Sequence, residues 1–97
     1  MPTYVTLIKY TQPGVENMKE SPDRLNAAKG IFKSMGAELK SFYLAMGRFD
    51  AVVISEIPDD ETAMKLSITL GSAGAIRTEG FRIFNEDEYQ KLISELP

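Results

Sequence analysis

The chain has 97 residues, of which 43% are hydrophobic and 26% are charged, so it fits one ordinary globular domain with a small core. Its net charge of −3 disfavours non-specific binding to nucleic acid or to anionic membranes. The chain contains no cysteine and no histidine, which removes disulfides and thiol chemistry and argues against zinc sites and histidine-ligated haem.

The N-terminal stretch 1–4 has neither a basic region nor an apolar segment of signal length, and no apolar run is long enough to span a membrane. We therefore expect a cytoplasmic protein with no membrane partner and no nucleic acid partner. We also expect no metal and no cofactor, because histidine and cysteine, which hold most such groups, are missing.

The first predicted strand, Tyr4–Tyr10, is rich in β-branched and aromatic residues and ends before Gln12-Pro13-Gly14. Strand alternation divides it into two faces, with Val5, Leu7 and Lys9 on one and Tyr4, Thr6, Ile8 and Tyr10 on the other. The second face is bulky and semi-polar. Such a face is typical of a wet cavity or of an interface.

A short helical turn is expected within Val15–Glu20, followed by a helix from Ser21 to Gly36. Ser21-Pro22-Asp23 supplies a serine N-cap, a proline at the first helical position and an acid in the first turn. An apolar stripe then recurs at steps of three and four residues: Leu25, Ala28, Ile31, Phe32 and Met35. Gly36 supplies the C-cap.

Two further strands, Glu38–Leu44 and Asp50–Ile57, flank a turn at Ala45-Met46-Gly47 and predict a β-hairpin. The second of these strands contains the continuous apolar run Ala51–Ile54. Such a run favours a central strand that is covered on both faces.

The rest of the chain predicts a helix over Asp60–Ser72, a strand over Ala75–Phe84 and a last helix after the capping box Asn85…Glu88. Most of the acidic surplus lies at the two helix starts, where carboxylates favour the helix dipole, and this explanation is preferred to an acidic binding site. The last helix carries an apolar face of Tyr89, Leu92, Ile93 and Leu96.

This order of elements predicts an α+β fold, a single domain over residues 1–97 with the ferredoxin-like βαββαβ arrangement and a C-terminal helix. A four-stranded antiparallel sheet would carry two helices on one face and leave the other face open. A second copy of the chain is the simplest cover for that face, which gives a dimeric α/β barrel. The C-terminal helix would cover a sheet edge or reach over to the partner.

The hairpin segment Gly47-Arg48-Phe49-Asp50 resembles the Gly-x-Tyr-Asp signature of the GYD family, with phenylalanine in place of tyrosine. Further agreement comes from Lys19-Glu20-Ser21-Pro22-x-Arg24, Phe42-Tyr43, Asp59-Asp60-Glu61 and Gly74-x-x-Arg77-Thr78, so that the resemblance spans about residues 3–90. It implies a small GYD-like domain of the dimeric α/β barrel superfamily with no firmly assigned reaction, forming a homodimer or a higher homo-oligomer. The Phe49 exchange suggests that this ring packs rather than reacts.

Six residues are candidates for binding a small molecule: Tyr4, Thr6, Tyr43, Arg48, Asp50 and Arg77. Arginine recognises anions with two parallel hydrogen bonds, and a tyrosine hydroxyl donates from an apolar surround. Each has a structural alternative as well. Asp50 would bind backbone amides or pair with Arg48, Arg77 would pair with Glu79, and the tyrosines would pack at an interface.

Three functions follow from these residues and stay open. The first is a binding module that holds a small organic acid or aromatic molecule in the barrel. The second is a cofactor-independent isomerase or monooxygenase-like enzyme with Tyr43 and Asp50 as acid and base, which requires both groups in one pocket. The third is a structural or assembly protein whose barrel is filled.

Overall fold

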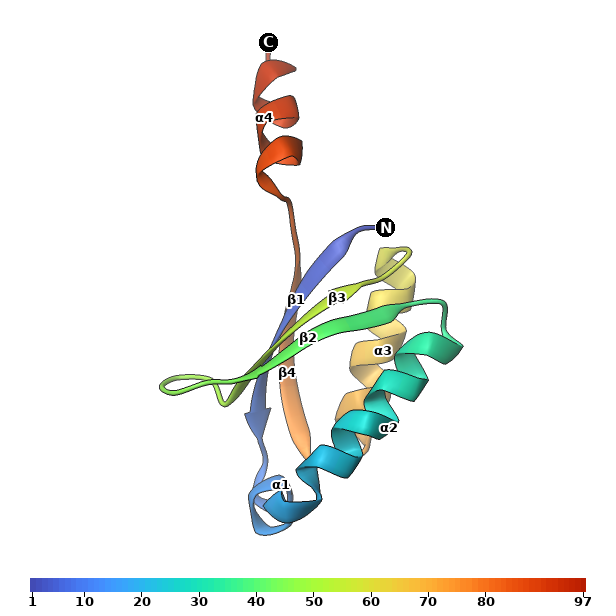
Figure 1. Ribbon diagram of the computed structural model, residues 1–97, viewed down its shortest axis with the longest axis vertical. Coiled ribbons are helices and arrows are strands. Elements are labelled where there is room, and N and C mark those ends of the chain that lie inside the picture. The colour runs from blue at the N-terminus through green and yellow to red at the C-terminus, as the bar shows by residue number, and fades with distance from the viewer.

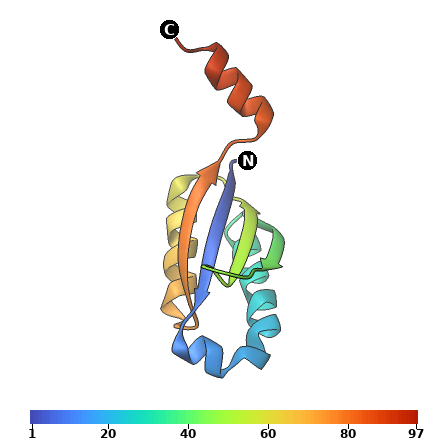
Figure 2. The same cartoon turned by 90° about the vertical axis from the view of Figure 1, so that its left-hand side faces the viewer.

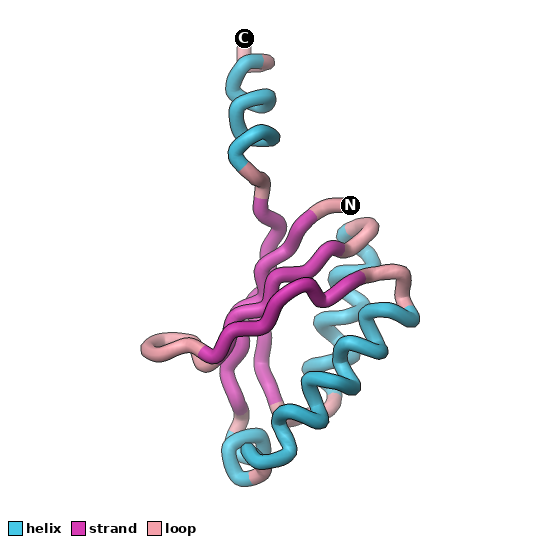
Figure 3. The backbone as a smooth tube through the Cα atoms, viewed as in Figure 1, coloured by secondary structure: helices cyan, strands magenta, loops and turns pink.

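A computed structural model describes all residues, 1–97, and contains one four-stranded antiparallel sheet with the strand order β2-β3-β1-β4. Two long helices cover one face of that sheet (Figures 1 and 3). The order along the chain confirms the predicted ferredoxin-like α+β fold. The elements are β1 (Thr3–Tyr10), α1 (Gln12–Glu16), a 3₁₀ turn η1 (Met18–Glu20), α2 (Ser21–Ser34), β2 (Glu38–Leu44), β3 (Ala51–Glu56), α3 (Asp60–Ser72), β4 (Ile76–Ile83) and α4 (Glu86–Ser94).

The helix-covered face of the sheet holds the core. Tyr4 packs with Phe32 of α2 and Leu66 of α3, while Ile8 packs with Ala51 and Val53 of β3. Because residues two apart share a face, Thr6 and Tyr10 also point towards the helices. The semi-polar face of β1 is therefore the inner face.

The opposite face of the sheet, called the open face below, has no helix over it (Figure 2). The strand register places a group of apolar side chains there: Val5, Leu7, Tyr43, Val52, Ile54 and Phe81. β3 is a central strand, as predicted. Its Ala51, Val53 and Ser55 are buried, but Val52 and Ile54 are only half-buried, so the chain alone does not cover its second face.

The start of α2 differs from the prediction. Ser21 is not an N-cap, because its backbone is already helical, with φ −55° and ψ −42°, and η1 leads directly into the helix. The Ser21 hydroxyl lies 3.3 Å from the hydroxyl of Tyr10 instead. The preceding helical turn also begins earlier than predicted, since the Thr11 side chain caps α1 by accepting from the Gly14 amide.

The two later helices begin where the sequence predicts. Asp59 accepts from the Thr62 amide at 2.8 Å, and this hydrogen bond holds the pKa of the Asp59 carboxyl below its ordinary value. Asn85 and Glu88 form the predicted capping box at the start of α4, with reciprocal hydrogen bonds of 2.8 and 3.0 Å.

The β2–β3 hairpin turns through residues 45–50. Gly47 has φ +103°, a left-handed conformation that glycine adopts without strain, and the Ala45 amide donates to the Asp50 carbonyl at 2.9 Å. Met46 at the tip is 99% exposed. Lys9 and Arg48 both lie over the Phe49 ring, at 5.8 and 6.0 Å from its centroid, which agrees with a packing role for this ring.

The C-terminal helix α4 stands away from the rest of the molecule, beyond the end of β4 (Figures 1 and 2). It covers no edge of its own sheet. Its apolar stripe is exposed, with Leu92 at 50% of full exposure. None of the helices combines the length and the apolar character that crossing a membrane would require.

Candidate functional site

Two adjoining cavities lie between the helix layer and the inner face of the sheet. They share the side chains of Thr6, Phe32 and Leu70 as a common wall. One has a volume of about 200 Å³ and the other about 360 Å³. Small residues open this space, because Ala27 and Ala28 of α2 line the first cavity and Gly80 of β4 lines the second.

The first, which we call the apolar cavity, is lined by 18 residues, 14 of them hydrophobic. The polar groups at one end of it are the Tyr10 hydroxyl and the side chains of Ser21 and Arg24. Aliphatic or aromatic groups therefore suit its interior, and hydrogen-bonding groups suit the end that these three residues form.

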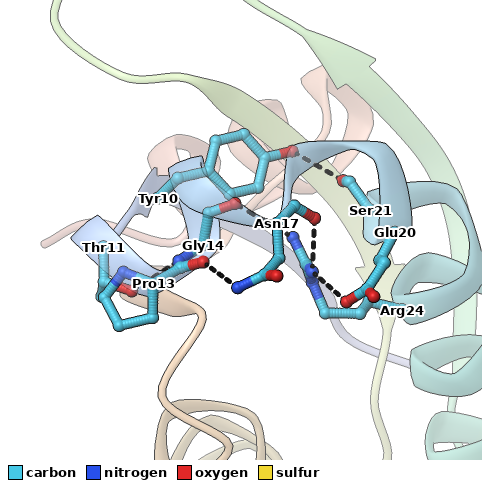
Figure 4. A network of polar contacts seen from close by, with 8 residues as sticks. All are labelled: Tyr10, Thr11, Pro13, Gly14, Asn17, Glu20, Ser21 and Arg24. Carbon is cyan, nitrogen blue, oxygen red and sulfur yellow. Dashed lines mark hydrogen bonds and ion pairs between the residues drawn. The ribbon is translucent and has the colours of Figure 1, made fainter.

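Arg24 ties this end of the cavity together (Figure 4). Its Nη1 donates to the Asn17 carbonyl at 3.0 Å and its Nη2 to the Gly14 carbonyl at 3.4 Å, with Glu20 at 3.9 Å. The guanidinium carries five N–H donors, so these contacts leave donors for another acceptor. The same side chain can thus hold the α1–η1 segment and face an anionic group.

The second cavity, the Tyr4 cavity, is more polar. The Tyr4 hydroxyl donates to Asp60 Oδ1 at 2.5 Å, and the Ser67 and Thr78 hydroxyls lie 3.1 Å apart. The hydrogen bond to Asp60, together with burial, raises the pKa of Tyr4 above its ordinary value. At neutral pH the Tyr4 hydroxyl is therefore protonated and donates its hydrogen to Asp60. Such a group suits the positioning of a ligand better than proton transfer.

The structure brings only two of the six sequence-predicted site residues into these cavities. Tyr4 lines one and Thr6 lines both. Tyr43 lies opposite Val52 and Arg77 opposite Lys9, so both belong to the open face, and Tyr43 is 59% exposed.

The remaining two predicted residues lie at the hairpin. Asp50 Oδ2 accepts from the Tyr10 amide at 2.9 Å, which is the backbone-binding alternative set out above. Arg48 is exposed and contacts the Phe49 ring rather than Asp50. In the three ion pairs of the structure, the cation is Arg24 once and Lys40 twice. Arg77 therefore does not pair with Glu79.

Sequence reasoning missed the polar residues that complete the cavities, namely Asp60, Ser67 and Arg82 in one and Ser21 and Arg24 in the other. In the sequence, Asp60 has a structural explanation as an acid in the first turn of a helix, and Ser21 has one as a helix cap. Neither position therefore indicates a binding residue. Arg82 lies directly opposite Tyr4 in the β1–β4 ladder, a neighbour that only the strand pairing reveals. No group of histidine, cysteine or acidic residues is arranged to hold a metal ion.

Comparison with solved structures supports the fold. A feast or famine regulatory protein from Mycobacterium tuberculosis, solved with L-methionine, superposes with a TM-score of 0.67 at 18% identity. The match covers 88% of this chain but only 51% of the regulator, so the chain spans about half its length. A protein from Thermus thermophilus gives a TM-score of 0.56 at 20% identity, over 88% of this chain and 95% of the other.

Comparison of amino-acid sequences adds a relative from a thermophilic bacterium. The chain is 27% identical over 79 residues to the glutamine synthetase and cystathionine beta-lyase binding protein of Thermus thermophilus, covering 80% of this chain and 83% of the relative. The family model described as the GYD domain matches residues 4–93, which include the hairpin segment Gly47–Asp50. The resemblance noted in the sequence is thereby confirmed, and the chain belongs to the GYD domain family.

Proposed function

We propose that this chain is a homodimeric binding module for a small carboxylic acid with an apolar body. The observation that carries the proposal is the pair of adjoining cavities between α2, α3 and the sheet. A mostly apolar cavity with a few polar groups gathered at one end is the usual form of a ligand site. Arg24 at the apolar cavity and Arg82 at the Tyr4 cavity each offer a guanidinium, whose geometry matches a carboxylate.

The dimer in this proposal forms through the open face. Val5, Leu7, Val52 and Ile54 are only half-buried and lie beside exposed Phe81. Contiguous apolar surface of this kind is rare on monomers and typical of an interface. Pairing the open faces leaves the ligand on the inner side of each sheet, rather than between the two sheets as the sequence alone suggested.

The ligand site is tested by thermal shift with a panel of small aliphatic and aromatic carboxylic acids, each paired with its primary amide. We expect acids of matching size to raise the Tm and their amides to do so less, because binding to the folded state stabilises it. Ala28→Leu fills the apolar cavity and should abolish the shift. Lys29→Leu, at an exposed neighbouring position of α2, should keep it.

A panel in which no acid raises the Tm would contradict the ligand proposal. So would an Ala28→Leu variant that responds as strongly as the native chain. Neither result bears on the dimer, which is measured separately.

A second candidate function is a protein-binding module. The Thermus thermophilus relative is named for binding glutamine synthetase and cystathionine beta-lyase, and the present chain exposes an unpartnered amphipathic helix and the hairpin tip at Met46. These features support an assembly role alongside ligand binding. The enzyme hypothesis draws no support from the geometry, because Tyr43 is exposed on the open face while the Asp50 carboxylate binds the Tyr10 amide.

A further inference from the structure

We propose that α4 of one copy docks on the basic end of the open face of a second copy. The basic end is defined by Lys9 and Arg77, which lie opposite each other in the β1–β4 ladder, and by Arg48 of the adjoining hairpin. This proposal rests on the open-face dimer described above. It assigns α4 a binding surface and fixes how the two sheets are oriented.

The C-terminal helix α4 needs a partner to be a stable helix. It has nine residues, and helices of that length are marginal in water without tertiary packing. Its sequence nevertheless contains a complete capping box and an apolar stripe of Tyr89, Leu92 and Ile93, all about half exposed. The stripe is therefore a surface for contact with another molecule.

A symmetric partner can cover the open face in two limiting orientations. Two sheets packed face to face are related by a two-fold axis that lies in the plane between them. If the axis runs along the strands, like ends of the two sheets meet. If it runs across the strands, the end that carries α4 meets the far end of the partner. Because α4 extends beyond the end of its own sheet (Figures 1 and 2), it would then lie next to that far end.

The distribution of charged side chains on the open face favours the arrangement with the two-fold axis across the strands. The end of the open face next to α4 carries Glu38 and Glu56 with Lys40, and the first turn of α4 adds Glu86, Asp87 and Glu88. The far end carries Lys9, Arg77 and Arg48. Among its acids, Glu79 lies one row further in, opposite Leu7, and Asp50 binds the Tyr10 amide. Crossing the sheets thus places the acidic end of each copy on the basic end of the other.

A charge swap tests this arrangement. Glu86 lies on the flank of the apolar stripe, three residues before Tyr89 and seven before Ile93, whereas Asp87 lies on the polar side with Lys91. Glu86→Arg and Arg77→Glu should each raise the dimer Kd about tenfold or more, and their combination should recover most of the native affinity. Asp87→Arg makes the same charge change on the wrong side, so it should have little effect and should not rescue Arg77→Glu.

A second pair of variants leaves the charge unchanged. Leu92→Gln should weaken the dimer, whereas Ser94→Gln, on the polar side of α4, should not. Equal effects of Glu86→Arg and Asp87→Arg, or a Kd that none of the stripe variants changes, would overturn the docking of α4. A native chain that is monomeric throughout would overturn the dimer itself, and a dimer that is indifferent to α4 would overturn only the present inference.

Discussion

At the scale of single residues, Tyr4 joins the two halves of the fold. It lies on the first strand, and its hydroxyl reaches Asp60 in the first turn of α3, 56 positions later. The aromatic ring packs in the larger core cluster with Phe32 and Leu66. One side chain therefore contributes apolar packing, a hydrogen bond between the sheet and α3, and part of a cavity wall.

The raised pKa of Tyr4 predicts a specific pH dependence of stability. The unfolded phenol titrates near its ordinary value of 10.0, and the folded one titrates above it. The Tyr4–Asp60 interaction therefore contributes fully below pH 10 and is lost as pH rises through the folded pKa. We expect Tyr4→Phe to unfold about 1 kcal/mol more easily at neutral pH, with a difference from the native chain that shrinks above pH 10.

Denaturant unfolding of both chains between neutral pH and alkaline pH measures this difference. The other tyrosines and the lysines are common to the two chains, so their titration cancels. Stability curves that stay parallel across the whole range would show that Tyr4 is not held protonated by the fold.

Gly14 is a second residue on which the fold depends. A Cβ at this position would lie 2.1 Å from the carbonyl oxygen of Ala75, and the Thr11 amide donates to that same carbonyl at 3.0 Å. The contact joins α1 to the start of β4 and leaves room for glycine alone. The backbone carbonyl cannot move aside without breaking this hydrogen bond.

Gly14→Ala should therefore destabilise the chain by roughly 1–3 kcal/mol, the range typical of overpacking. The matched change Gly30→Ala lies within α2, where an added Cβ meets nothing within 4 Å. Because alanine is the better helix former, Gly30→Ala should stabilise by about 0.5–1 kcal/mol. Thermal or denaturant unfolding distinguishes the two signs, and a neutral Gly14→Ala would contradict the packing described for α1.

At the scale of elements, the sequence predicts correctly the helix starts and turns that depend on residues close together in the chain. The caps at Asp59 and Asn85 and the hairpin around Gly47 were predictable because each depends on residues a few positions apart. The start of α2 was not, since the 3₁₀ turn before it leaves Ser21 inside the helix. The pairing of that serine with Tyr10 depends on how the α1–η1 segment folds back on β1.

The cavity residues also divide into those that neighbouring positions predict and those that only the folded structure brings together. Alternation along β1 placed Tyr4, Thr6 and Tyr10 on one face, which is the face that lines the cavities. Which face met the helices was not predictable from β1 alone, because both faces carry bulky apolar residues. The contributions of Asp60 and Arg82 required the helix position and the strand register, which join residues far apart in the chain.

At the scale of the whole molecule, two features have no partner within the chain. One is the open face of the sheet, with Val52 and Ile54 at its centre, and the other is the apolar stripe of α4. A chain of 97 residues buries only a modest fraction of its surface when it folds alone, so covering these two features would add to its stability. In the dimer proposed above, a second copy covers both features, and the two cavities stay on the inner sides of the two sheets.

The most direct test of this account is sedimentation of the full chain across a dilution series at micromolar concentration. We predict a dimer, which Val52→Asp should dissociate by placing a charge at the centre of the open face. Ile68→Asp, at an exposed position of α3 on the helix-covered side of the sheet, should leave the dimer intact. A native chain that sediments as a folded monomer at every concentration would contradict the claim that the open face is an interface between two copies.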